Sequence, residues 1–213
     1  MSVADAVRRE REAFAETVRG VDPDGPTLCE GWTVRDLLAH LVIRDRRPDA
    51  TPGIFLPVLA VWTGAVQQRL ARRDATDLVE TVRRGPPPSV PAAYPPMDRI
   101  DLLEYFVHHE DVRRATGAVE PRPADAERDR ILWTVLAMAG PAMHWRSPVG
   151  IVLRRPDGTE HRAHPGLPGR GRVVVTGEIG ELVLHTVGRT ACAVSFHGRD
   201  DDVAAVRRLN RAV

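Results

Sequence analysis

The chain has 213 residues, 43% of them hydrophobic, and a formal net charge of +1 at pH 7. A near-neutral chain lacks the basic field that draws a protein to nucleic acid or to an anionic membrane, and no apolar run reaches the roughly 20 residues that span a bilayer. All 30 basic residues are arginine, which excludes Schiff-base and lysine general-base chemistry. Residues 1–12 lack the apolar stretch of a secretory signal, and the two cysteines form no CxxC pair, so we expect a cytoplasmic protein with reduced thiols.

Apolar periodicity predicts a helix-rich N-terminal region. Capping residues mark the start of two helices, one from Ser2 to about Arg19 and one from Thr33 to Arg47. An apolar segment at 54–70 and a short helix at 76–84 follow. The proline-rich segment at 85–96 cannot form a regular helix and is predicted to be a loop.

Two further long helices complete the first domain. Asp98 and Gly117 are the predicted cap and stop of one, and the other covers residues 123–144, with a bend or an end near Gly140 and Pro141. Four long helices are typical of an antiparallel bundle. Residues 1–147 are therefore predicted to form a four-helix bundle.

The pattern changes after residue 147. Two short alternating segments flank Pro156-Asp157-Gly158, which is the signal of a β-hairpin. The predicted fold class is α+β, with a small α+β domain at 148–213 following the bundle. Its other predicted elements are strands at 172–176 and 191–197 and helices at 178–187 and 200–212.

The predicted helix at 98–117 places ionisable side chains in its apolar stripe. Glu104, His108 and Asp111 share that face, and burying a carboxylate costs several kcal/mol unless it is paired or bound to a metal. Glu104 and His108 are four residues apart, so they lie on neighbouring turns. His40 interrupts the apolar run LLAHLVI of the second helix. Two histidines and a glutamate are typical ligands of catalytic zinc and leave a fourth position for water or substrate.

Simpler interpretations remain open for each residue. His40 also fits a hydrogen-bonded core histidine, and the glutamate–histidine pair also fits an ordinary helical ion pair. Asp111 fits either a hydrogen-bond partner of a ligating histidine or an ion-pair partner of Arg114 or Arg44.

Other candidate side chains are weaker. His109 points about 140° away from Glu104 around the helix axis, so we do not expect it to be a ligand. Cys29 lies in the loop before the His40 helix, where an inert, partly buried thiol is favoured over a reactive one. The remaining histidines are predicted to be structural or on the surface: His144, His161, His164, His185 and His197.

Two motifs carry a resemblance to a known family. LCEGWTVRDLLAHL, residues 28–41, resembles the GW-[TS]-x-x-[DE]-L-x-x-H-[LV] signature of the DinB-like metal-binding bundles. LEYFVHHEDVRRATG, residues 103–117, is similar to the E-x-x-x-H-x-x-D signature of the actinobacterial mycothiol-dependent maleylpyruvate isomerase family. GELVLHTVGRTACAVSFHG, residues 180–198, resembles that family's SCP2-like C-terminal domain.

The resemblance implies a metal site and a thiol cofactor. The ligands of a divalent metal, most often zinc, would be His40, Glu104 and His108. Mycothiol would be the cofactor of an isomerase or S-transferase acting on a small electrophilic substrate. Arg44 and Arg47 are candidate contacts for an acidic group of the thiol or substrate, although a solvated surface run also fits them.

A second hypothesis is a metal-binding or regulatory module without catalysis. It predicts a closed site whose fourth ligand is Asp111, Cys29 or another histidine. The predicted partners under the first hypothesis are a small-molecule thiol and a small-molecule substrate, with no nucleic acid and no membrane.

Overall fold

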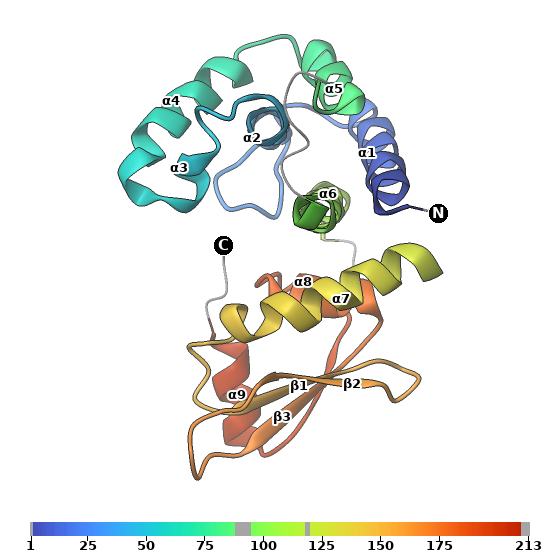
Figure 1. Cartoon of the computed structure of the whole chain (residues 1–213), viewed down its shortest axis with the longest axis vertical. Helices are drawn as coiled ribbons and strands as arrows, with labels where there is room; N and C mark the ends of the chain where they lie inside the picture. Colours follow the sequence, from blue (N-terminus) through green and yellow to red (C-terminus); the bar gives the residue numbers. More distant parts are fainter. Residues whose placement is uncertain (1, 88–94, 118–119, 210–213) are drawn as a thin grey trace. The chain divides into compact units, whose positions relative to one another are not determined.

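The computed structural model describes residues 2–87, 95–117 and 120–209. The chain divides into two compact units, Met1–Ala118 and Val119–Val213. The first is built from helices, and the second combines helices with a four-stranded sheet (Figure 1). The predicted α+β class is therefore confirmed.

The described part of the first unit is a set of packed helices. Helix α1 packs against α5 and α6, while α2 packs against α4 and α5. The elements are α1 (Val3–Arg19), α2 (Val34–Arg46), α3 (Pro52–Phe55), the 3₁₀-helix η1 (Pro57–Leu59), α4 (Ala60–Ala71), α5 (Ala75–Arg84) and α6 (Pro95–Arg113).

Reciprocal capping fixes the starts of α1 and α2, as the sequence predicts. Ser2 and Thr33 each accept a hydrogen bond from the backbone N–H three residues later, and Asp5 and Asp36 accept one in return. In α2 every residue from 37 to 43 is buried. A helix that is apolar on all sides must be surrounded, which agrees with its contacts to both α4 and α5.

Helix α6 begins earlier than the sequence predicts. It starts at Pro95 instead of at an Asp98 cap, and it ends at Arg113, followed by a turn in which Gly117 has a φ of 88°. Proline is well suited to the first helical position because that residue's N–H would have no intrahelical partner. Most of the predicted proline-rich loop, residues 88–94, lies outside the described residues.

In the second unit, helices pack against a mixed sheet, with α7 on β2 and α9 on β3. The hairpin of β1 (Gly150–Arg154) and β2 (Glu160–His164) turns at Gly158, whose φ of 87° suits glycine. The sheet order is β2-β1-β3-β4, with β1 and β3 parallel and the other pairs antiparallel. The remaining elements are α7 (Ala126–Met143), β3 (Arg172–Thr176), α8 (Ile179–Thr186), β4 (Ser195–His197) and α9 (Asp200–Arg207).

Helix α7 groups with the second unit, whereas the sequence prediction placed it in a bundle ending at residue 147. Its contacts are to α8 and β2, and a Cβ added at Gly140 would lie 3.3 Å from the Cβ of Ala163 in β2. The helix also continues through Pro141 to Met143. An apolar helix can cover a sheet as well as another helix, so its sequence pattern does not fix its partner.

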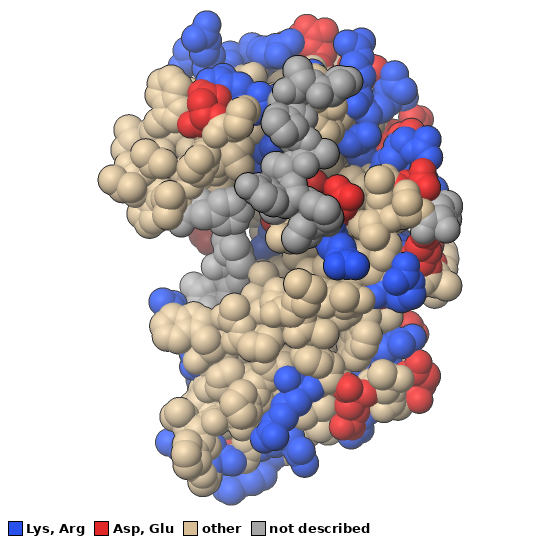
Figure 2. All heavy atoms as spheres, in the orientation of Figure 1, with Lys and Arg blue, Asp and Glu red and all other residues tan. Residues whose placement is uncertain are grey.

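An apolar surface follows α3, η1 and α4. Figure 2 shows mostly uncharged atoms over this region, and the exposed side chains there include Val58 at 84%, Val61 at 85% and Trp62 at 52%. No helix in the described ranges is long and apolar enough to cross a membrane.

Candidate metal centre

Helices α2 and α6 bring His40, Glu104 and His108 together. The Oε2 atom of Glu104 lies 3.7 Å from Nε2 of His40 and 3.4 Å from Nε2 of His108. The two imidazole rings are 5.1 Å apart between centroids and nearly perpendicular. One ligand atom from each residue lies within 4.8 Å of the others. The three candidates selected from the sequence therefore face one point.

The charges in this group are arranged around Glu104. Burial raises the pKa of Glu104, but His108, His40 and Arg44 outweigh it and hold the pKa well below its usual range. Burial alone lowers the pKa of His108, yet hydrogen bonds to Asp111 and Cys29 and the contact with Glu104 raise it well above the ordinary value. Burial lowers the pKa of His40. These shifts favour the ionised form of Glu104, the protonated form of His108 and the neutral form of His40.

The donor set fits a divalent metal ion. Nε2 of His40 is buried and has no hydrogen-bond partner among the described residues, although a buried imidazole nitrogen is ordinarily satisfied. It faces an ionised carboxylate oxygen that is also close to a second imidazole nitrogen. A metal ion at this point would satisfy all three atoms and replace the proton of His108. The Glu104 side chain is 24% exposed, so the group is open on that side.

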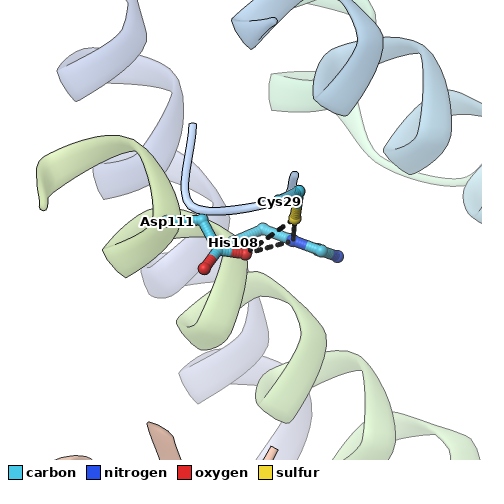
Figure 3. A group of neighbouring side chains, drawn as sticks. All are labelled: Cys29, His108 and Asp111. Carbon is cyan, nitrogen blue, oxygen red and sulfur yellow. Dashed lines mark hydrogen bonds and ion pairs between the residues drawn. The ribbon is translucent and has the colours of Figure 1, made fainter. Parts of the chain in front are cut away.

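Behind His108 lies a second polar group, drawn in Figure 3. Nδ1 of His108 is 3.0 Å from Oδ2 of Asp111, and the Cys29 thiol donates a hydrogen bond of 3.2 Å to the same oxygen. Asp111 is fully buried. The structure thus shows Asp111 as a partner of His108, one of the two interpretations left open by the sequence, and it pairs Arg114 with Glu110 at 2.5 Å. A carboxylate on the far nitrogen of a ligating histidine fixes its tautomer and orientation.

The N-terminal segment of the chain resembles a known family. Residues 5–53, which include α1, α2 and His40, match the family model described as the mycothiol maleylpyruvate isomerase N-terminal domain. The N-terminal segment is therefore similar to that domain. A search of curated proteins found no match.

Two solved structures resemble nearly the whole chain. One is a histidine-to-alanine mutant of the mycothiol-dependent maleylpyruvate isomerase, with a TM-score of 0.63, and the other is that isomerase itself, with a TM-score of 0.59. Each is 19% identical to this chain, and the alignment covers 91% of both chains. The similarity shows that the shared fold extends over both units. Together with the N-terminal match, it confirms the resemblance expected from the sequence motifs.

The two arginines predicted to contact a cofactor have carboxylate partners in the structure. The Arg44 side chain is 5% exposed, and it lies 3.2 Å from Asp101 and 3.6 Å from Oε1 of Glu104. Arg47 forms two hydrogen bonds to Asp49, at 2.8 and 2.7 Å. Arg44 therefore holds the Glu104 oxygen that faces away from the histidines, a role that the sequence did not indicate.

His109 faces α1, as the helical spacing predicts. Its Nδ1 lies 2.8 Å from Glu10, and its Nε2 lies 2.8 Å from the hydroxyl of Thr17. His109 thus joins α6 to α1 and takes no part in the candidate metal centre. Of the other histidines, His144 and His185 are buried in the second unit.

Sequence reasoning missed Trp32. Its ring centroid lies 5.2 Å from that of His40, in a tilted arrangement. The GW pair of the first motif was the available signal, but a motif alone does not say which side chain the indole contacts. In the structure, the Trp32 indole packs beside His40, a candidate metal-ligating residue.

This placement predicts that Co²⁺ bound at the centre quenches the fluorescence of Trp32. Since Trp32 is one of four tryptophans, a Co²⁺ titration of the full chain should remove part of the emission, whereas diamagnetic Zn²⁺ should not. Trp32→Phe keeps an aromatic ring and should abolish most of the Co²⁺ effect. Equal quenching in the variant and the wild type would contradict the placement.

Proposed function

We propose that the chain binds one divalent metal ion through His40, Glu104 and His108 and acts as a mycothiol-dependent isomerase or S-transferase on a small electrophilic substrate. The convergence of three ligand atoms from two helices on one point carries this proposal. Two histidines and one carboxylate suit zinc, which in catalytic sites keeps a fourth position open. The names of the similar structures, each a mycothiol-dependent maleylpyruvate isomerase, favour mycothiol as the thiol.

The protein's own residues prepare the centre for this chemistry. A divalent ion bound there would favour the thiolate form of a thiol. Asp111 accepts from Nδ1 of His108 and keeps Nε2 turned toward Glu104. Arg44 holds the outer oxygen of Glu104, which leaves the inner oxygen for the metal. The Glu104 side chain is partly exposed, which leaves this side of the centre accessible to solvent. This arrangement supports addition of a thiol to an electrophilic carbon.

Arg44 and Arg47 remain proposed contacts for an acidic group of the thiol or substrate. Arg47 is the better supported of the two, because its side chain is 36% exposed and that of its partner Asp49 is 49% exposed. An exposed ion pair contributes little free energy and is readily exchanged. The Arg44 side chain is only 5% exposed, and to contact a ligand it would have to break its ion pairs with Asp101 and Glu104.

At the level of the fold, we propose that the helices of the first unit form a DinB-like bundle and that the second unit is SCP2-like. The 91% coverage of the similar isomerase structures supports a shared two-unit organisation. The contacts of α7 with α8 and β2 support assigning this helix to the SCP2-like unit.

A closed, non-catalytic metal site is less well supported. That alternative needs Cys29 or Asp111 as the fourth ligand. Both contact Nδ1 of His108, whereas Glu104 contacts Nε2 of the same ring. The two nitrogens lie on different edges of the imidazole, so neither side chain completes the sphere of a metal held on Nε2.

Elemental analysis and a thiol-dependence assay test the proposed function together. The full chain purified from zinc-supplemented medium should contain about one zinc ion per chain, as expected for a single site with three protein ligands. Incubation with maleylpyruvate and a panel of unsaturated diacids and electrophiles should give turnover only when mycothiol is added. Preparations that retain no metal after dialysis would overturn the metal site. Stoichiometric metal without thiol-dependent turnover would instead favour the non-catalytic module.

A further inference from the structure

The segment from Leu28 to Trp32 lies against both histidines of the candidate metal centre. At one end, the Leu28 N–H donates to the backbone oxygen of Asp111 at 3.0 Å, which ties the segment to α6. At the other end, Trp32 contacts the ring of His40 in α2. One short loop therefore joins the two helices that supply the proposed ligands.

The loop has a fixed internal structure. The Thr27 hydroxyl donates to the backbone oxygen of Trp32 at 3.0 Å and accepts from the N–H of Cys29 at 3.2 Å. The Trp32 N–H donates to the Cys29 oxygen at 3.0 Å. These bonds hold the Cys29 side chain toward α6, where Figure 3 shows its sulfur beside His108 and Asp111.

Cys29 and His108 share one carboxylate oxygen. The thiol donates to Oδ2 of Asp111 at 3.2 Å, and the Nδ1–H of His108 donates to the same atom at 3.0 Å. The sulfur is 3.9 Å from Nδ1. A carboxylate can rotate about its terminal torsion, which is broad compared with an sp³ torsion. A second donor on the same oxygen restricts that rotation and keeps the oxygen aimed at His108.

We infer that Cys29 is a positioning residue of the metal centre: its thiol holds the Asp111 carboxylate in the orientation that directs His108 at the metal. The inference rests on the proposed metal-binding function and assigns Cys29 neither a nucleophilic nor a ligating role. Cys29 acts on the metal centre through its hydrogen bond to Asp111. Its effect on metal affinity must therefore vanish in a variant in which residue 111 has no carboxylate.

The test measures Zn²⁺ affinity of the full chain by competition with a chromophoric chelator. Removing an outer hydrogen-bond partner of a ligating histidine typically weakens metal binding 10–100-fold, and we expect an effect of about that size for Asp111→Asn. Cys29→Ala removes one hydrogen bond a step further out and should weaken binding about 3- to 10-fold. In the Asp111→Asn background, Cys29→Ala should have no further effect, because residues in one network are not additive.

Two matched variants separate positioning from a loss of structure. Cys29→Ser keeps a donor at the same place and should bind Zn²⁺ within about twofold of the wild type. Cys192→Ala removes the other cysteine, whose thiol donates to the backbone oxygen of Arg189 in the second unit, and should leave the affinity unchanged. Thermal unfolding of each variant checks that it is folded.

Each other outcome overturns the inference. An unchanged affinity in Cys29→Ala, with metal retained by the wild type, rejects Cys29 and leaves the proposed function standing. A loss of the same size in both backgrounds indicates a structural role only. A thiolate-to-cobalt charge-transfer band in the Co²⁺ protein, lost in Cys29→Ser, would make Cys29 a ligand. A wild type that binds no metal overturns this inference together with the proposed function.

Discussion

His40→Ala and His108→Ala are each expected to leave the purified protein without retained metal. Each substitution removes one of three protein ligands. If a zinc site contributes roughly 10–16 kcal/mol in total, the loss of one ligand costs on the order of 3 kcal/mol, or more than 100-fold in affinity. Elemental analysis after dialysis measures the result directly. Both side chains are buried, with exposures of 7% and 8%, so thermal unfolding of each variant has to show that it is folded.

His197→Ala is the matched control for these variants. His197 is an exposed histidine in β4 of the second unit, and its loss should leave about one zinc ion per chain, the content of a single site. Stoichiometric zinc in either His40→Ala or His108→Ala would show that the ligand assignment is incorrect, even if the wild type binds zinc.

The residues that converge at the centre were predictable because their signals are local. Glu104 and His108 lie four residues apart on one helix, and that spacing alone places them on adjacent turns. A histidine in the fully apolar run of α2 has to face a buried partner. Whether α2 and α6 turn these faces toward each other depends on helix packing, which the family motifs supplied and periodicity did not.

The surroundings of the centre depend on long-range contacts that no spacing encodes. The loop contacts of Cys29 and Trp32 follow from the path of the chain between α1 and α2. The contact of Asp111 with both Cys29 and His108 joins residues about 80 positions apart in the chain, and the helical spacing does not predict it. Likewise, the contacts of α7 follow from a sheet formed later in the chain.

Asp45 is expected to make the stability of the protein depend on pH. It lies in α2, where the Tyr105 hydroxyl donates to its Oδ2 at 2.7 Å. Burial raises the pKa of Asp45 to about 6 from an ordinary value of 3.8, although the hydrogen bond from Tyr105 opposes the shift. Because the folded protein holds this proton more tightly than the unfolded chain, the stabilisation is present below about pH 4 and is lost as the pH rises through about 6.

Asp45→Asn should remove that loss, because the amide is neutral and its carbonyl oxygen can still accept from Tyr105. A shift of two pKa units corresponds to about 3 kcal/mol, so the stability of the variant relative to the wild type should rise by up to that amount between about pH 4 and pH 7. Urea unfolding of the full chain, followed by far-ultraviolet circular dichroism across this range, measures the change.

Asp49→Asn is the control: Asp49 is exposed and its pKa is lowered to about 2, chiefly by the hydrogen bond from Arg47, so it titrates below this window. The prediction fails if the difference in unfolding free energy between Asp45→Asn and the wild type stays constant from pH 4 to pH 7. The carboxyl of Asp45 would then not titrate in this range, and charges other than those of Arg11 and Arg44 would have to offset its burial.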